Sequence, residues 1–158
     1  MHTTEPTAAA APRASRASGK RAHMDCYQLG DHAEFSKTVT DFDVYGFAGI
    51  VGDFYGVHVD EEFAKKTRFE RRIAQGALSV GFLATVMGHM AAKAPSPGAV
   101  SYRYDITFHA PVHIGDTVKA MLELDEKDEA RNTCIFGATV LNQRGEVVAS
   151  GRTYLKVL

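Results

Sequence analysis

The segment Ile73–Ala92 runs for 20 residues without a Lys, Arg, Asp or Glu, and it limits the folds open to this chain more than any other feature. Small residues recur along one helical face at Ala77, Gly81, Ala84 and Gly88, and a bulky face lies beside it at Leu78, Phe82, Val86 and Met90. A helix that is apolar on nearly all sides must be covered on nearly all sides. The segment therefore predicts one long central helix, with a sheet or a partner helix packed closely against it.

A membrane span is the alternative interpretation of this segment, because its length just reaches the ~20 residues that a span needs. The segment also contains the polar residues Gln75, Ser79, Thr85 and His89, and the sequence offers no second candidate span. We therefore expect a buried helix of a soluble protein, with no membrane as a partner.

The sequence after Pro95 changes to a strand-like character. The run Pro95-Ser96-Pro97-Gly98 breaks the helix, and four strand-like runs follow, at 100–108, 117–124, 134–141 and 147–156. With an alternating run at 33–39, they predict an antiparallel sheet of about five strands wrapped on the central helix, which is an α+β architecture. One sheet on one helix leaves an open edge, so we expect a homodimer or a higher homo-oligomer.

Helix signals also occur before the central segment. Thr40 and Asp43 have the spacing of a capping box, and apolar residues at helical spacing predict a helix over 41–51. We expect residues 53–58 to form a loop and Asp60 to cap a short helix over 61–66.

Length and charge limit the classes of function. The 158 residues suit one compact domain, which we place at 25–158, after an Ala-, Ser- and Arg-rich segment, 1–24, that is expected to be a flexible tail. The net charge is −1, and the chain outside this tail carries −4, so no basic surface for nucleic acid is expected.

The two cysteines, Cys26 and Cys134, have neither a metal-binding nor a redox spacing, and residues 1–24 contain no apolar signal segment. We expect reduced thiols in the cytoplasm, with a disulfide between them as the less favoured alternative. The sequence contains no metal-ligand set or phosphate-binding loop, so no metal and no cofactor are expected.

A carboxylate and an imidazole stand five residues apart at Asp53 and His58, a pair that can exchange protons with water. Gly76 and Ala77 open the central helix, where backbone N–H groups suit a developing negative charge on an oxygen. The spacing alone favours a turn-capping Asp53 and an ordinary loop histidine over a catalytic pair.

Three ordered motifs add to this pattern. Residues 52–60 read Gly-Asp-Phe-Tyr-Gly-Val-His-Val-Asp, residues 72–78 read Arg-Ile-Ala-Gln-Gly-Ala-Leu, and residues 108–118 contain Pro-Val-His-Ile-Gly-Asp-Thr-Val. In these motifs the chain resembles the MaoC-like dehydratases of the hotdog fold, a family that includes the (R)-specific enoyl-CoA hydratases. The family patterns are Gly-Asp-x-Asn-Pro-x-His-x-Asp, Arg-Ile-Ala-His-Gly-Met-Leu and Phe-x-x-Pro-Val-x-x-Gly-Asp-Thr-Val, and the resemblance covers about residues 27–158.

The resemblance implies a hotdog dimer that acts as a hydro-lyase on an enoyl or 3-hydroxyacyl thioester, usually of coenzyme A. Carried over to this chain, Asp53 and His58 handle the water, with Asp53 favoured as the base. The N–H at Gly76, next to Ala77, holds the thioester oxygen. Ser79, one turn into the helix, is expected either to face the substrate pocket or to bond back to its own helix.

The chain departs from the family patterns at two places. Tyr55-Gly56 replaces Asn-Pro, so Tyr55 either fills part of the acyl pocket or points away from it. Gln75 replaces the histidine before Gly76, which keeps a polar group but removes a titratable one. Two alternatives therefore stay open beside the hydratase: a hotdog acyl-CoA thioesterase, and a non-catalytic acyl-CoA-binding subunit.

Overall fold

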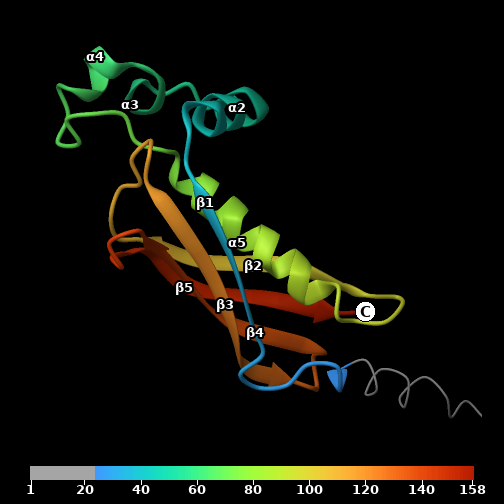
Figure 1. Cartoon of the computed structure of the whole chain (residues 1–158). Helices are drawn as coiled ribbons and strands as arrows, with labels where there is room; N and C mark the ends of the chain where they lie inside the picture. The colour runs from blue at the N-terminus through green and yellow to red at the C-terminus, as the bar shows by residue number, and fades with distance from the viewer. Residues whose placement is uncertain (1–23) are drawn as a thin grey trace, which may run out of the picture.

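The computed structural model describes residues 24–158, in which a five-stranded antiparallel sheet wraps one long helix (Figure 1). The predicted tail, 1–24, lies outside the described residues except for Met24. The sheet has the order β1-β3-β4-β5-β2. The elements are β1 His32–Thr38, α2 Asp41–Val51, α3 Gly56–Val59, α4 Glu61–Ala64, α5 Gly76–Ala91, β2 Ala99–Phe108, β3 Thr117–Asp128, β4 Thr133–Asn142 and β5 Val147–Val157.

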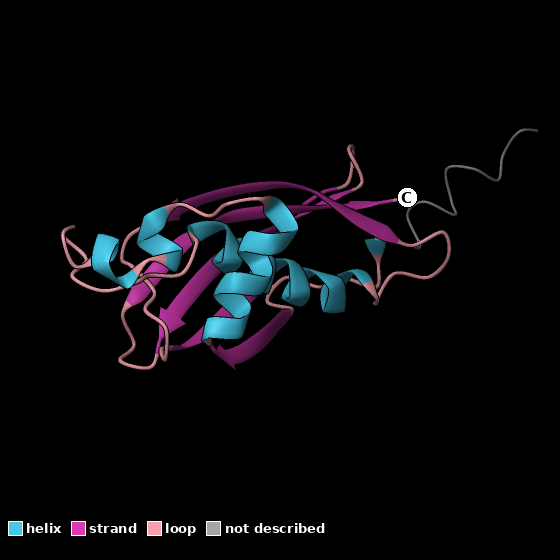
Figure 2. Cartoon of the chain, turned by 90° about the horizontal axis from the view of Figure 1, so that it is seen from above, coloured by secondary structure: helices cyan, strands magenta, loops and turns pink. Residues whose placement is uncertain are grey.

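The core lies between α5 and the concave face of the sheet. Seen from above, the strands curve around the helical layer (Figure 2). Alternate residues of β3, β4 and β5 point inward and are buried, as the period of two in a strand requires. They pack against the bulky face of α5, and the fully buried members of this core include Leu83, Val86, Met87, Leu122, Leu124, Phe136 and Leu155.

The small-residue face of α5 is not covered within the single chain. Its four members, Ala77, Gly81, Ala84 and Gly88, are all exposed, whereas the bulky face packs on the sheet. The two edge strands of the sheet are β1 and β2, and on β2 the side chains of Val100, Tyr102 and Phe108 are also exposed. One apolar stripe and the two sheet edges are therefore left unpaired within the single chain.

Helix α2 begins and ends where the sequence predicted. The Thr40 hydroxyl accepts from the Asp43 N–H at 3.4 Å, and Asp43 Oδ2 accepts from the Thr40 N–H at 2.9 Å, which completes the capping box. At the other end, Gly52 adopts a left-handed φ of 82°, and its N–H bonds the Ala48 carbonyl. Helices α2, α3 and α4 together form an overhang beyond one end of the sheet (Figure 1).

Two local predictions need correction. Residues 53–58 are not all loop, because His58 lies on the short helix α3. Strand β3 continues past Leu124 to Asp128, since a register shift between Leu124 and Glu126 lets its polar end keep pairing with β4.

Two further predictions can be compared with the described residues. Among residues 24–158, no helix has the length and apolar character needed to cross a bilayer. Cys134 is fully buried, and burial raises the pKa of its thiol to about 11, so this sulfur packs in the core and is a poor nucleophile at neutral pH.

Candidate active site

The turn after α2 brings Asp53 to His58. Because Gly52 reverses the chain direction, Asp53 begins a short loop, in which its Oδ1 accepts from the Tyr55 N–H at 3.3 Å. The other oxygen, Oδ2, lies 3.7 Å from His58 Nε2. The Asp53 side chain is 43% exposed and that of His58 only 12%, so a partly solvated carboxylate faces a largely buried ring.

One contact fixes the tautomer of His58. Its Nδ1 lies 2.8 Å from the Ile73 carbonyl oxygen, which can only accept, so Nδ1 carries the hydrogen. In the neutral form of the ring, the lone pair of Nε2 then points toward Asp53 Oδ2, and two acceptors face each other. A water that donates one hydrogen to each acceptor resolves this arrangement. At a separation of 3.7 Å, one water about 2.8 Å from both atoms can do so with modest bending.

The start of α5 provides two N–H groups without a partner. Gly76 and Ala77 are the first two residues of the helix, so their N–H groups have no carbonyl one turn earlier. Within residues 24–158 neither group donates to another backbone carbonyl. A Cβ built on Gly76 would lie 3.1 Å from two carbons of the Phe108 ring, so only glycine fits here without displacing that ring.

A cavity of about 210 Å³ joins these parts. Its lining includes His58, Gly76 and Ser79, together with apolar side chains such as Phe108 and Val148. Ser79 is 5% exposed and has no hydrogen-bond partner within the described residues, so its side chain faces the cavity. It does not bond back to its own helix, which was the alternative considered from the sequence.

The other predicted site residues lie at or outside the edge of this cavity. Asp53 does not line it and reaches the site through His58. Ala77 is exposed beside the cavity. Tyr55 is 61% exposed and packs edge-on against His58 and Phe63, so it points away from the cavity rather than filling it.

Gln75, the residue before the helix, ties α5 to α2. Its Nε2 donates to the Val44 carbonyl at 3.2 Å, and its Oε1 is buried without a partner among the described residues. The carbonyl of Val44 requires the amide nitrogen on that side, so the orientation of the side chain is fixed.

Arg72 was not predicted to have a role, yet it joins α2 and α4, which lie on either side of the loop and short helix that carry Asp53 and His58. Its guanidinium pairs with Asp41 of α2 at 2.7 Å and with Glu61 of α4 at 3.1 Å, and it also donates to the Tyr45 hydroxyl. Tyr45 in turn donates to the Val59 carbonyl at 2.9 Å. Partial burial opposes the charge, but the two carboxylates outweigh this and raise the pKa of Arg72 above its usual range.

The third motif has a structural role. Asp116 accepts from the His113 N–H at 2.9 Å and from Gln143 at 2.7 Å. Burial raises the pKa of Asp116, but these hydrogen bonds and Arg144 lower it more, and the net pKa lies below the usual range. The turn holds Val112, whose carbonyl accepts from the N–H of Ala74 just before α5.

Known proteins of one family match most of this chain. The MaoC like domain family matches residues 27–144. An (R)-specific enoyl-CoA hydratase of Rhodospirillum rubrum is 37% identical over 81% of this chain and 86% of its own length. A 3-hydroxybutyryl-CoA dehydratase of Methylorubrum extorquens is also 37% identical, over 85% of this chain and 83% of its own.

The fold agrees with these sequence matches. The solved structure of an (R)-hydratase from A. caviae superposes with a TM-score of 0.76 at 26% identity, covering 84% of this chain and 98% of the other. The five-stranded antiparallel sheet wrapped on one long helix is therefore the hotdog fold, as the resemblance implied. On both the sequence and the architecture, the chain belongs to the MaoC-like domain family.

Proposed function

We propose that this protein is a hydro-lyase that adds water to an enoyl thioester of coenzyme A, or removes it from the 3-hydroxyacyl product. The named activities of the two relatives at 37% identity support this reaction class. The observation that carries the proposal is the 3.7 Å separation of Asp53 Oδ2 and His58 Nε2, with the opposite ring nitrogen held by the Ile73 carbonyl. We place one water between these two atoms, with its oxygen lone pairs free to attack.

In the hydration direction, the water oxygen forms a bond to the β-carbon of the conjugated thioester. Asp53 takes the proton released from this water, while His58 orients the water through Nε2. The electron pair of the double bond moves onto the thioester oxygen as an enolate, and the Asp53–His58 pair returns one proton to the α-carbon. One water is added across the double bond, and neither side chain is consumed.

The enolate oxygen is the charge that the enzyme must stabilise. We place it at the N–H groups of Gly76 and Ala77, where the helix terminus adds partial positive charge. One preorganised donor of this kind is worth about 3 kcal/mol, or roughly 100-fold in rate. The apolar lining near Phe108 and Val148 keeps this region dry and suits the acyl chain.

The active form is a homodimer. A second copy of the chain packs against the exposed small-residue face of α5. The small side chains on this face permit close approach of another helix, and they belong to Ala77, Gly81, Ala84 and Gly88. Pairing of β2 with its counterpart satisfies one of the two open edges of the sheet. Cytoplasmic location stays a prediction from the sequence.

Purified protein assayed with crotonyl-CoA tests the reaction class. We expect loss of the enoyl absorbance without release of free thiol. Thiol release at the same rate as the loss of crotonyl-CoA would instead identify the thioesterase. Binding of acyl-CoA without turnover, over a panel of chain lengths, would identify a non-catalytic subunit.

A further inference from the structure

The segment 65–72, which connects α4 to the approach of α5, is basic, whereas residues 24–158 as a whole are acidic. Residues 24–158 hold 14 basic and 18 acidic side chains, a net charge of −4. Within these eight residues, however, five are basic and only Glu70 is acidic. We call Lys65–Arg72 the basic segment.

Only part of this charge is neutralised by the protein. Lys65 pairs with Glu62, and Arg72 pairs with the two carboxylates described above. The other three cations, Lys66, Arg68 and Arg71, are exposed and form no ion pair with any residue in 24–158. Three like charges are thus held within six residues, among which Glu70 is the one acidic residue.

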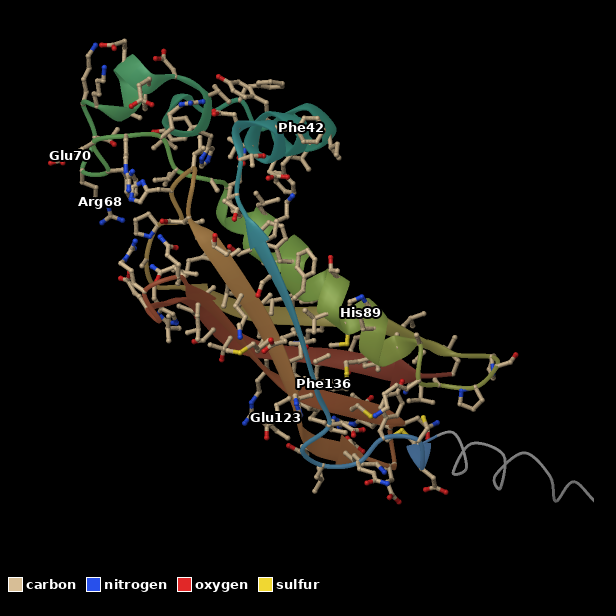
Figure 3. The ribbon with its side chains drawn as sticks, in the orientation of Figure 1. Phe42, Arg68, Glu70, His89, Glu123 and Phe136 are labelled. Atoms are coloured by element: carbon tan, nitrogen blue, oxygen red, sulfur yellow. The ribbon has the colours of Figure 1, made fainter. Side chains whose placement is uncertain are left out.

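The middle cation of the three stands at the rim of the substrate cavity. Arg68 lines the cavity together with Phe69, and its guanidinium carbon lies 4.9 Å from the centre of the Phe69 ring, which orients the side chain. Apart from its histidines, Arg68 is the one ionisable side chain among the lining residues that the structure describes. Figure 3 shows Arg68 and Glu70 projecting outward from the loop.

We infer that Lys66, Arg68 and Arg71 bind the phosphate groups of the coenzyme A part of the substrate. This inference rests on the proposed function, because it assigns the carrier of the same thioester. The pantetheine arm separates the thioester from the diphosphate and the 3′-phosphate. The phosphates therefore belong at the rim, outside the apolar space beside Gly76. Arg68 offers a planar fork suited to phosphate oxygens, and the flanking cations supply further charge.

The triple variant Lys66→Gln/Arg68→Gln/Arg71→Gln tests the inference. We compare kcat/KM for crotonyl-CoA with kcat/KM for crotonyl-pantetheine, which has the same reacting atoms and no nucleotide. Each exposed cation is expected to contribute about fivefold to the preference for the nucleotide-bearing substrate. The ratio of kcat/KM for crotonyl-CoA to kcat/KM for crotonyl-pantetheine therefore falls about 100-fold in the triple variant. The preference of the wild type for crotonyl-CoA also shrinks with added salt, because exposed charges are screened.

Arg152→Gln is the matched control. Arg152 is an exposed arginine on β5, and its neighbour Thr153 points into the core, so the Arg152 side chain lies on the face of the sheet opposite the core. Its substrate ratio should equal that of the wild type. An unchanged ratio in the triple variant would overturn the inference. So would a wild-type kcat/KM for the acyl carrier protein thioester that exceeds the one for crotonyl-CoA.

Calorimetric binding of coenzyme A itself separates this inference from the proposed reaction. If the wild type binds coenzyme A and the triple variant binds it about 100-fold more weakly, the phosphate site stands even if no thioester is hydrated. Equal binding by both proteins would refute the phosphate site, whatever the enzyme catalyses.

Discussion

Replacement of Arg72 by methionine should loosen the frame of the active site without removing a reacting group. The Arg72 guanidinium connects Asp41 on α2 with Glu61 on α4, and the loop and short helix that carry Asp53 and His58 lie between those two helices. Methionine keeps the apolar stem of the side chain but lacks the guanidinium, so both ion pairs and the hydrogen bond to Tyr45 are deleted.

The expected loss of stability is modest. The Asp41 and Glu61 side chains are 61% and 45% exposed, so each ion pair contributes at most about 1 kcal/mol. The Arg72 side chain is only 19% exposed, which places the combined loss near the upper end, at about 1–2 kcal/mol. For a chain of this size, the midpoint of thermal unfolding should fall by about 3–6 °C.

The expected loss of activity is larger in relative terms. A displacement of about 1 Å in the catalytic loop can cost up to about 100-fold in rate, so we expect a loss of about 10-fold or more in kcat for crotonyl-CoA hydration. Stability is measured by thermal and urea unfolding. The control is Arg131→Met, because Arg131 pairs with Asp128 in the distant β3–β4 turn and its side chain is 82% exposed.

Two results would refute this reasoning. An Arg72→Met variant no less stable than Arg131→Met would show that the network contributes nothing measurable. A variant destabilised as expected, but with wild-type kcat at a temperature where it is folded, would show that the network does not position the site.

Three further predictions follow from the same contacts. Asp43→Ala should cost about 1–2 kcal/mol by removing the capping box. Burial raises the pKa of Asp43, but its hydrogen bonds lower it more, and the net pKa lies below the usual value. The loss of stability in Asp43→Ala, measured by urea unfolding, should therefore be complete at neutral pH and shrink as the pH falls below about 4. Gly76→Ala should change the free energy of unfolding by less than about 1 kcal/mol, since Phe108 is 51% exposed and can shift. The value of kcat should nevertheless fall about 10-fold or more, because the added methyl group narrows the site. Ser79→Ala should change the free energy of unfolding by no more than about 0.5 kcal/mol, because the Ser79 hydroxyl has no hydrogen-bond partner among residues 24–158. The same variant should raise KM about fivefold, and an unchanged KM would show that Ser79 does not contact the substrate.

The elements that were predicted well depend on local signals. The range of α2 follows from a capping box and a left-handed Gly52, both set by residues within the helix and its caps. The central helix and the four strands after it follow from hydrophobic periodicity, which sequence displays directly. The helix begins at Gly76 rather than Ile73, because Ile73 and Ala74 are held by backbone contacts with the third motif.

The parts that were missed depend on distant partners. Arg72 interacts with Asp41 and Glu61, which lie 31 and 11 residues away, and nothing in the local sequence specifies that meeting. The polar end of β3 pairs only because β4 returns alongside it. His58 and the Ile73 carbonyl are 15 residues apart, so the hydrogen bond that sets the tautomer appears only in three dimensions.

The most direct test of the shared water between Asp53 and His58 is kcat/KM for crotonyl-CoA hydration by Asp53→Asn. Asparagine keeps the shape of the side chain and cannot take a proton, so we expect a fall of about 10³-fold. The midpoint of thermal unfolding should stay within about 2 °C of the wild type, because the replaced side chain is 43% exposed. Wild-type turnover by this folded variant would contradict the assignment of Asp53 as the group that accepts the proton from water.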